Sequence, residues 1–387
     1  MAKKILYIWK DKYPWDVRVA KFCNSLAESG YEIHMLARSC SEELQSGKID
    51  DIYIHKLELD KSGFSSLPVP FNPRWKRFIK RKIAEINPDL IIIREIMLGE
   101  TAGKIAKENN IPIIMDMAEN YPAAMREWKK YNSSRISKYI MHNMRVPDIV
   151  EKRSLRYMDG VIIVCVEQIE RLFSLYLYPK ENMWLVHNTP AKDLFKRVKK
   201  DKSDKFIIGH HGYLTAEKSI NNLILGFAEA LQKRQDIELH IWGDGECYDD
   251  YKKLIENNNI SDNVKLKGAY EYSRLNEIIN GFDLGVIPYQ ISDFNNYTIH
   301  NKIFDYFACG KPVLVSEAEP LQRIIHETKA GTVVDCESPE GIAEAIINLN
   351  DAELEEYSQN AYKAFQDKYN WETDLHTLQQ TIDKYLT

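Results

Sequence analysis

Residues 283–316 read DLGVIPYQISDFNNYTIHNKIFDYFACGKPVLVS, and this stretch predicts a strand, a polar loop, a short helix and a second strand. The apolar runs Leu284–Tyr289 and Val313–Ser316 are expected to form the two strands. The helix is expected to begin near Asn301 and to end at Gly310. Glycine suits the left-handed position after a helix, and the proline two residues later cannot continue one.

The start of this predicted helix carries the chemistry. A loop that ends at a helix N-terminus offers free backbone N–H groups and a positive dipole end, which is where phosphate binds. Lys302 adds a full positive charge in the first turn, where the helix dipole disfavours it unless an anion compensates. Asp305 follows three residues later, on the same helical face. A cation for a diphosphate and an acid for sugar hydroxyls, one turn apart, indicate a nucleotide-sugar site.

The segment NKIFDYFACGKPVLVS resembles the donor-binding helix of retaining GT-B glycosyltransferases of the glycosyltransferase family 4 type. In that family two glutamates mark this helix, and the second bonds the ribose of the nucleotide. Asp305 matches the second acid, whereas Tyr297 stands in the place of the first. The resemblance runs over most of the chain and is strongest from Ile207 to Val334.

Both halves of the chain alternate apolar strands with helices, which predicts an α/β fold of two doubly wound, Rossmann-like domains. Two such domains would place the carboxyl ends of both sheets against a shared cleft. We expect an acceptor-binding domain over residues 1–190 and a donor-binding domain over residues 203–365. Residues 366–387 are expected to form a terminal helix, which the resemblance places back on the first domain.

Composition and charge narrow the classes of function. The chain has 387 residues and a net charge of −5, but residues 1–190 hold 30 Lys and Arg against 24 Asp and Glu, a net +6, which leaves −11 for the remainder. The negative total argues against a nucleic-acid partner. No apolar run approaches the roughly 20 residues that span a bilayer, and the N-terminus leads directly into a strand, so a cytoplasmic protein is expected.

The densest basic stretch is RWKRFIKRK at residues 74–82. Its interleaved apolar residues allow an amphipathic helix that lies on the inner, anionic face of the cell membrane as a peripheral contact. The alternative interpretation is a solvated helix whose apolar residues belong to the core.

The remaining donor residues follow from strand ends in the second half. Lys218 comes shortly after a strand and a glycine turn, and a lysine there suits a leaving diphosphate. By resemblance an arginine would occupy position 213, where this chain has Tyr213, and Lys302 is the expected replacement for that charge. The expected donor-binding set is Gly212, Tyr213, Gly243, Gly245, Gly268, Tyr270, Tyr297, Thr298, Ile299, His300, Asn301 and Asp305.

In the first half, residues 112–122 are expected to run from a strand into a loop that faces the acceptor. The resemblance places a histidine at position 118, where this chain has Ala118, so no histidine role carries over. Asp116 and Glu119 remain as carboxylates that orient an acceptor hydroxyl or steady positive charge at the anomeric carbon. Alternatively, Asp116 caps a loop and Glu119 faces water. Asp16 and Arg18 are expected to contact the acceptor, or else to start a helix.

The resemblance implies transfer of a sugar from a nucleoside diphosphate sugar, with UDP favoured, to a hydroxyl of a glycan or lipid-linked acceptor. It also implies retention of configuration, no cofactor and no required metal, with Lys218 and Lys302 neutralising the leaving diphosphate. Surface polysaccharide or glycoconjugate synthesis is the expected setting. The alternatives are an epimerase or phosphorylase of the same architecture and a catalytically silent nucleotide-sugar binding protein. A nicotinamide oxidoreductase is disfavoured because no G-x-G-x-x-G follows the first strand.

Overall fold

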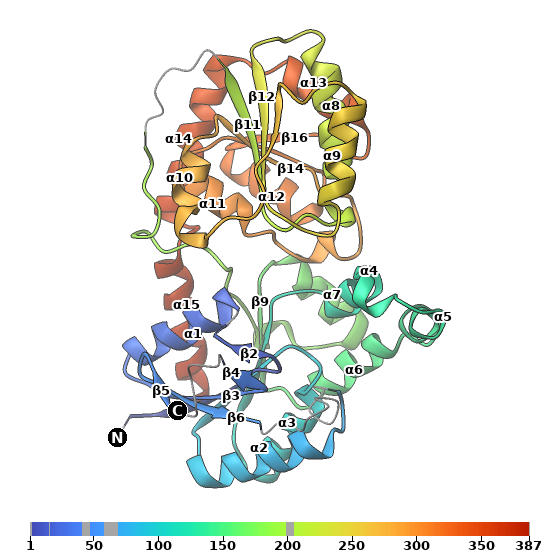
Figure 1. Cartoon of the computed structure of the whole chain (residues 1–387). Helices are drawn as coiled ribbons and strands as arrows, with labels where there is room; N and C mark the ends of the chain where they lie inside the picture. The colour runs from blue at the N-terminus through green and yellow to red at the C-terminus, as the bar shows by residue number, and fades with distance from the viewer. Residues whose placement is uncertain (1, 15, 41–46, 58–68, 199–204, 387) are drawn as a thin grey trace. The chain divides into compact units, whose positions relative to one another are not determined.

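The computed structural model describes residues 2–14, 16–40, 47–57, 69–198 and 205–386 (Figure 1). The chain divides into two compact units. Unit 1 comprises Met1–Val186 and Leu375–Thr387, and unit 2 comprises His187–Asp374. The chain therefore leaves unit 1 once, after its last strand, and returns to it within its last helix. Each unit is an α/β domain built on its own sheet, as the alternation of strands and helices predicted.

Unit 1 is built on an eight-stranded sheet in the order β10-β9-β8-β7-β1-β3-β6-β5. All neighbours pair in parallel except β5 and β6, which are antiparallel. The strands are β1 (Lys4–Ile8), β3 (Glu32–Ala37), β5 (Lys48–Ile49), β6 (Ile52–Lys56), β7 (Leu90–Arg94), β8 (Ile113–Met117), β9 (Gly160–Ile163) and β10 (Met183–Leu185). A separate parallel pair joins β2 (Lys12–Tyr13) to β4 (Ser39–Cys40).

The helices of unit 1 cover this sheet, and several of them begin at a side chain that caps them. They are α1 (Val17–Glu28), α2 (Pro73–Ile86), α3 (Gly99–Glu108), α4 (Tyr121–Glu127), α5 (Arg135–Lys138), α6 (Val146–Leu155) and α7 (Glu167–Tyr176). The side chain of Asp16 accepts a hydrogen bond from the N–H of Val19 and so caps α1. Asn72 caps α2 in the same way, with proline at the first helical position.

Unit 2 is built on a six-stranded, wholly parallel sheet in the order β13-β12-β11-β14-β15-β16. The strands are β11 (Phe206–His211), β12 (Ile237–Trp242), β13 (Val264–Leu266), β14 (Leu284–Ile287), β15 (Val313–Val315) and β16 (Gly331–Val333). The helices are α8 (Ile220–Leu231), α9 (Tyr248–Asn257), α10 (Leu275–Asn280), α11 (Lys302–Ala308), α12 (Glu319–Thr328), α13 (Pro339–Ile347) and α14 (Asp351–Asp367). The reversal of strand order beside β11 is the switch point at which doubly wound sheets bind ligands.

The last helix, α15 (Trp371–Leu386), begins in unit 2 and joins unit 1 from Leu375 onward. Tyr385 donates its hydroxyl proton to the backbone carbonyl of Asp159 at 2.9 Å. Gln379 donates to the Ser29 hydroxyl at 2.8 Å. These bonds fasten the end of the helix to unit 1.

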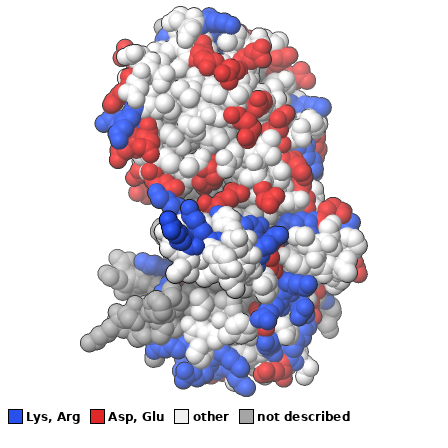
Figure 2. Space-filling model, turned by 90° about the vertical axis from the view of Figure 1, so that its right-hand side faces the viewer, with Lys and Arg blue, Asp and Glu red and all other residues white. Residues whose placement is uncertain are grey.

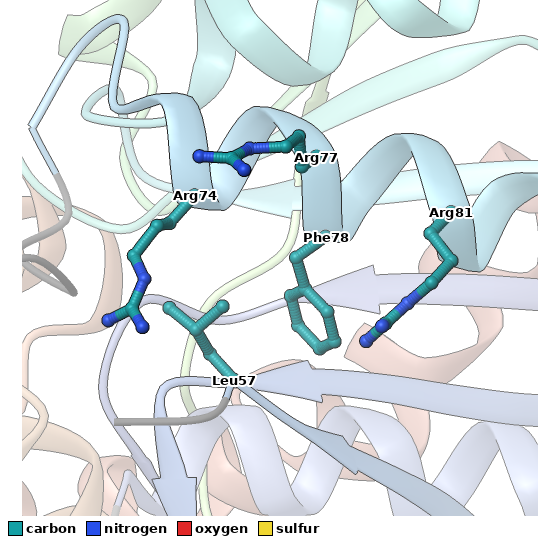
Figure 3. Close-up of a pocket in the computed structure, with 5 residues that line it drawn as sticks. All are labelled: Leu57, Arg74, Arg77, Phe78 and Arg81. Atoms are coloured by element: carbon teal, nitrogen blue, oxygen red, sulfur yellow. The ribbon is translucent and has the colours of Figure 1, made fainter. Parts of the chain in front are cut away.

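Helix α2 contains the basic stretch at residues 74–82, and its apolar residues Trp75, Phe78 and Ile79 are buried in the core of unit 1. Figure 3 shows three arginines of α2 around a hollow whose floor includes Leu57 and Phe78. The alternative interpretation of this stretch, a solvated helix with its apolar residues in the core, is therefore confirmed. An amphipathic helix at a bilayer needs an exposed apolar face, which α2 lacks. Among the described residues, no helix is long and apolar enough to cross a membrane.

Candidate active site

Three loops that follow neighbouring strands of unit 2 meet in one compact turn region. The N–H of Gly212, after β11, donates to the carbonyl of Trp242 at 2.8 Å, and the N–H of Gly243 donates to the carbonyl of Gly268 at 2.8 Å. A Cβ atom on Gly243 would lie 1.9 Å from the Gly212 carbonyl oxygen. Gly212 and Gly243 have φ values of +119° and +147°, which glycine tolerates best. The two loops can approach this closely only because residue 243 is glycine.

Lys302 lies directly over this turn. A Cβ atom on Gly212 would be 2.6 Å from the Lys302 ammonium nitrogen, so that ammonium group occupies the space beside the glycine. The same nitrogen is 5.5 Å from the ring centroid of the buried Tyr289. Burial lowers the pKa of Lys302 to about 8, although Asp305 acts in the opposite direction. A buried lysine whose charged form is disfavoured in this way indicates a place where an anionic ligand binds.

Lys218 supplies a second positive charge to the same region. It ends the short helix η5 (Ala216–Lys218), and its ammonium group donates to the backbone carbonyl of Tyr213. Burial lowers the pKa of Lys218, and the positive charge of Lys302 contributes to the same shift. Tyr213 stands where the resemblance expects an arginine, and its side chain, which is 63% exposed, supplies no positive charge there. The two lysines therefore bring two positive charges to this turn region.

Three neutral histidines surround these lysines. His210 and His211 end β11, and the Nδ1 atom of His210 lies 2.9 Å from the Val286 carbonyl, to which it must donate. Burial lowers the pKa of His210 to about 3, with Lys302 as the next cause. Burial likewise lowers the pKa values of His211 and His300 well below their usual value. Near neutral pH the histidines therefore add hydrogen-bonding atoms but no charge.

Five buried polar atoms at the carboxyl ends of β11, β14 and β15 or in the loop before α11 have no hydrogen-bond partner in the described part of the chain. They are His210 Nε2, His211 Nε2, Tyr289 Oη, Thr298 Oγ1 and Ser316 Oγ. A buried polar atom without a partner costs about 1–3 kcal/mol. Such a cluster fits a polyhydroxyl or phosphate ligand, which would supply the missing bonds.

Asp305 lies one turn into α11 and is buried. Its negative charge adds to burial in raising the pKa of Tyr272 to about 12, and it acts in the same direction on Tyr270. Tyr270 also exchanges a hydrogen bond with His211, at 3.1 Å between the hydroxyl and Nδ1. The predicted acid and the predicted base-facing tyrosine therefore lie in one neighbourhood.

The other predicted donor residues have mostly structural surroundings. Gly245 packs against the backbone of Leu214, where a Cβ atom would lie 2.3 Å from a carbonyl oxygen. Tyr297 ends the short helix η7 (Asn295–Tyr297) and is half-buried, while Ile299 is buried. Asn301 stands at the N-cap of α11 without a side-chain cap bond.

His300 faces inward from the loop before α11. Its Nε2 atom lies 2.8 Å from the Asn295 side-chain oxygen, and its ring meets the Tyr289 ring edge-on at 4.2 Å. Asn295 and Tyr289 therefore hold the His300 ring inside the loop.

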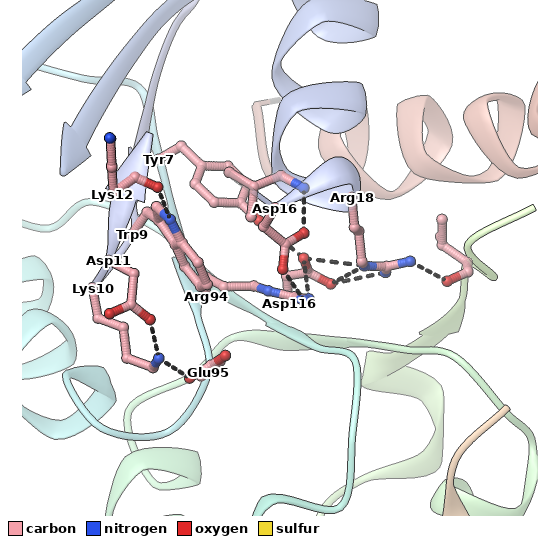
Figure 4. Close-up of polar contacts among 12 residues, drawn as sticks. Tyr7, Trp9, Lys10, Asp11, Lys12, Asp16, Arg18, Arg94, Glu95 and Asp116 are labelled. Atoms are coloured by element: carbon pink, nitrogen blue, oxygen red, sulfur yellow. Dashed lines mark hydrogen bonds and ion pairs between the residues drawn. The ribbon is translucent and has the colours of Figure 1, made fainter. Parts of the chain in front are cut away.

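Three of the four residues predicted in unit 1, Asp16, Arg18 and Asp116, join Arg94 in a largely buried ionic cluster (Figure 4). Asp116 has no exposed surface and accepts hydrogen bonds from Arg18 at 2.8 Å, from Arg94 at 2.9 Å and from the Tyr7 hydroxyl at 2.9 Å. Arg94 also lies 3.5 Å from Asp16. Arg18 donates its remaining Nη1 to the Val186 carbonyl. The cluster ties β1, β7, β8 and α1 together.

The expected placement of Asp116 in a loop is wrong. It lies within β8, where its carboxylate is enclosed by two arginines, so a ligand has no access to it in this conformation. Glu119 follows β8 and is half-buried, and Asp16 serves as the cap of α1, as the alternative interpretation predicted. Of the four predicted residues in unit 1, only Asp16 and Glu119 expose part of their surface.

Sequence reasoning missed several polar residues of the site. Among them are His210 and His211, which end β11, and Ser316, which follows β15. Their common signal is position, because each stands at the carboxyl end of a parallel strand, where doubly wound sheets bind ligands. Arg94, the end of β7, carried the same signal in unit 1.

The fold places this protein in the GT-B class, which consists of two Rossmann-like units in one chain. Two solved structures share it over nearly the whole length. The sucrose-phosphate synthase of Thermosynechococcus elongatus has a TM-score of 0.77 at 17% identity, covering 99% of this chain and 98% of that one. The HepE protein of Anabaena, solved with UDP, has a TM-score of 0.73 at 12% identity, covering 99% and 100%.

Sequence comparison gives the family. Residues 16–189 match the model of Glycosyltransferase Family 4, and residues 191–366 match that of Glycosyl transferases group 1. The chain belongs to this family of glycosyltransferases. It is 24% identical over 209 residues to the poly(glycerol-phosphate) alpha-glucosyltransferase of Bacillus subtilis, over 53% of this chain and 30% of that protein. The matches to that protein and to three other curated relatives each span less than half the length of the relative.

Proposed function

We propose that this glycosyltransferase moves a sugar from a nucleoside diphosphate sugar, most favourably a UDP-sugar, to an acceptor hydroxyl with retention of configuration. The observation that carries the proposal is a pair of partly desolvated lysines, Lys302 beside Gly212 and Lys218 on the Tyr213 carbonyl, set among buried polar atoms that lack partners in the described part of the chain. The family membership supports sugar transfer, and the charge of the two lysines supports a diphosphate leaving group. The UDP bound in the HepE structure belongs to that protein and supports the choice of base.

The polar residues of this site in unit 2 then have defined parts in the transfer. Lys302 and Lys218 hold the diphosphate and stabilise the charge that develops as the sugar departs. Asp305 accepts hydrogen bonds from the ribose hydroxyls. The hydroxyls of Thr298 and Ser316 bond the diphosphate or the transferred sugar.

The transfer itself requires no side-chain base. The bond between the anomeric carbon and the phosphate oxygen breaks, and the acceptor oxygen bonds that carbon on the same face. The acceptor proton passes to the leaving phosphate oxygen, which becomes more basic as it departs. This route agrees with the enclosure of Asp116, whose carboxylate is already committed to Arg18 and Arg94.

We further propose that the acceptor is a surface polysaccharide or another glycoconjugate precursor and that the reaction takes place in the cytoplasm. Poly(glycerol-phosphate) is the acceptor named for one relative, and it supports a hydroxyl-bearing polymer as acceptor class. The positive net charge of residues 1–190 favours an anionic acceptor.

Thermal unfolding with single nucleotides tests the donor. We expect UDP to raise Tm more than GDP, ADP or CMP, since UDP is the proposed donor nucleotide. A ligand at 100 times its Kd adds about 2.7 kcal/mol to stability, which is a measurable shift. Asp305→Ala should lose this shift, while Lys252→Met, which changes an exposed lysine on α9, should keep it.

We expect turnover of the UDP-sugar to survive chelation with EDTA, since the lysines neutralise the diphosphate. A UDP shift without turnover on any acceptor would favour the silent binding protein, and no shift at all would remove the donor site.

The pH dependence of UDP binding tests the charge on Lys302. The ammonium form binds the diphosphate, and the pKa of Lys302 in the free protein is about 8. The affinity for UDP should therefore be independent of this group below pH 8 and fall by about tenfold per pH unit above it. Calorimetry in buffers of different ionisation enthalpy should show proton uptake on binding above pH 8. A flat affinity between pH 7 and pH 10 would contradict the assignment.

A further inference from the structure

The switch point of the unit 1 sheet lies between β1 and β7. From β1 the chain continues to β3 on one side, and from β7 it continues to β8 on the other. The loops that follow these two strands therefore diverge, and doubly wound sheets bind their ligands in the crevice that such loops open. The first charged side chains beyond the two strands are Lys10, after β1, and Glu95, after β7.

Glu95 is held in an unusual conformation at this point. Its φ is +68°, in the left-handed region that residues other than glycine rarely adopt and that recurs at functional sites. Its backbone N–H donates to the Asp116 carbonyl at 3.2 Å, and the Lys10 ammonium nitrogen lies 3.2 Å from its Oε2 atom. Its other carboxylate oxygen, Oε1, accepts no hydrogen bond within the described part of the chain, and Figure 4 shows it pointing away from Lys10. One oxygen is therefore anchored and the other is available.

The side chains of Lys10 and Glu95 are covered without being sealed. Their exposed fractions are 14% and 12%, whereas Asp116 has no exposed surface. Burial raises the pKa of Glu95, although Lys10 acts in the opposite direction. Lys10 is shared between Glu95 and Asp11, so these three side chains together carry a net negative charge. Glu95 is thus an acid at this edge of the sheet that a ligand can reach, which Asp116 is not.

Tyr121 adds a hydroxyl group to the same edge. It begins α4 just beyond β8, the strand next to β7, and is 4% exposed. Its Oη atom has no hydrogen-bond partner among the described residues. Burial raises the pKa of Tyr121, Arg94 acts in the opposite direction, and the charge of Glu95 adds to the rise, so the hydroxyl and the carboxylate lie in one neighbourhood. A buried hydroxyl in this state indicates a place where a ligand supplies the missing bond.

We propose that Glu95 and Tyr121 form an acceptor subsite that binds hydroxyl groups of a neutral sugar or polyol. The Oε1 atom of Glu95 accepts a hydrogen bond from one hydroxyl of the ligand, and the Tyr121 hydroxyl bonds another. Lys10 positions the carboxylate through Oε2. The subsite serves the acceptor of the proposed sugar transfer, and its assignment to an acceptor rests on that function.

The subsite also selects which part of an acceptor enters it. The net negative charge of Lys10, Asp11 and Glu95 repels a phosphate group, so a neutral end that carries hydroxyls is preferred. The charged groups of an anionic acceptor find cations elsewhere on unit 1, because Figure 2 shows lysine and arginine side chains over the face of this unit that it displays. The acceptor class is therefore a glycan or polyol chain whose charged groups stay outside the subsite.

Saturation-transfer difference NMR of the full chain with methyl glucoside, a neutral polyol, tests the subsite. We expect Glu95→Gln to weaken glucoside binding about tenfold, because a charged hydrogen-bond acceptor is lost. Tyr121→Phe should weaken it about fivefold, because a neutral hydrogen bond is lost. The unchanged chain should prefer methyl glucoside to its phosphate monoester, and Glu95→Gln should narrow this preference.

The Tm values of matched variants separate a binding role from a structural one. Tyr121→Phe removes a buried hydroxyl that gains nothing in the free chain, so Tm should be unchanged or higher. Tyr7→Phe removes a hydroxyl that donates to Asp116 at 2.9 Å, so it should lower Tm and leave glucoside binding unchanged. Glu100→Gln removes an acid that is 11% exposed and lies 2.7 Å from Lys104, and it should also leave glucoside binding unchanged.

The rise in Tm with UDP reports on the donor site separately, and both subsite variants should keep it. Glucoside binding that depends on Glu95 and Tyr121 in a chain that UDP does not stabilise would support the polyol subsite and contradict the proposed sugar transfer. The subsite is overturned if the unchanged chain does not bind methyl glucoside, or if Glu95→Gln and Tyr121→Phe bind it as the unchanged chain does. It is also overturned if Tyr7→Phe or Glu100→Gln loses as much glucoside binding as the subsite variants.

Discussion

Replacement of Lys302 by methionine is expected to abolish UDP binding at accessible concentrations and to lower kcat by about 10²–10³-fold, the usual loss when one group that stabilises the leaving charge is removed. Its ammonium nitrogen fills the space beside Gly212, the turn on which the diphosphate is proposed to rest. Methionine keeps most of the side-chain volume and removes only the charge. Steady-state kinetics with a UDP-sugar and calorimetry with UDP measure the two effects.

The stability of the Lys302→Met variant supplies an independent check. In the folded chain the pKa of Lys302 is lowered from 10.5 to about 8, so the unfolded chain binds more protons between these values. The charged lysine therefore destabilises the free protein below pH 8, and this cost disappears as the pH rises towards 10.5. The variant should be at least as stable as the unchanged chain at pH 7. A variant that loses Tm at pH 7 would show that Lys302 serves packing instead.

The fold was largely predictable because its strands are continuous apolar runs. The strand pattern from Leu284 to Ile287 and the helix that starts at Lys302 are where the sequence placed them. Such runs are typical of parallel sheets buried on both faces, and a glycine with a following proline ends α11 unambiguously. The sequence pattern therefore located β14, β15 and α11 to within two residues at each end.

Residues of the candidate site could be singled out from the sequence where a charge is unusual for its position. Lys302 stands in the first turn of a helix, where the dipole opposes it, and Asp305 follows on the same face. By contrast, His210 and Ser316 carry no such local signal. They join the site because β11, β14 and β15 are neighbours in the sheet, and that pairing is a tertiary fact.

The prediction that Asp116 lies in a loop failed for a similar reason. A carboxylate near the end of a strand can point to a ligand or to a cation from another element, and local sequence does not distinguish them. The partners Arg18 and Arg94 come from α1 and β7, 98 and 22 residues away in the chain. The same long-range placement explains the basic helix α2, whose apolar residues turned out to belong to the core rather than to a lipid-facing surface.

Replacement of Asp116 by alanine is expected to destabilise unit 1 by about 3–5 kcal/mol, the usual cost of removing one partner from a buried ion pair. The change leaves Arg18 and Arg94 buried without their shared acid, and it removes the acceptor of the Tyr7 hydroxyl. Thermal unfolding followed by circular dichroism measures the loss. Glu119→Ala, which removes a half-buried acid just after the same strand, serves as the control and should change Tm little.

The pH dependence of stability and the activity of Asp116→Asn together distinguish a structural from a chemical role. Burial alone would raise the pKa of Asp116, but Arg18 and Arg94 hold it below its usual 3.8. The Asp116 carboxylate therefore contributes its full stabilisation above pH 3.8, and this contribution is lost as the pH falls through the lowered pKa. The stability of Asp116→Asn should lack this dependence on acidic pH. Asp116→Asn should lower Tm yet retain turnover at temperatures where it stays folded. An unchanged Tm with lost turnover would instead make Asp116 a catalytic residue, which would require the arginines to release it when the acceptor binds.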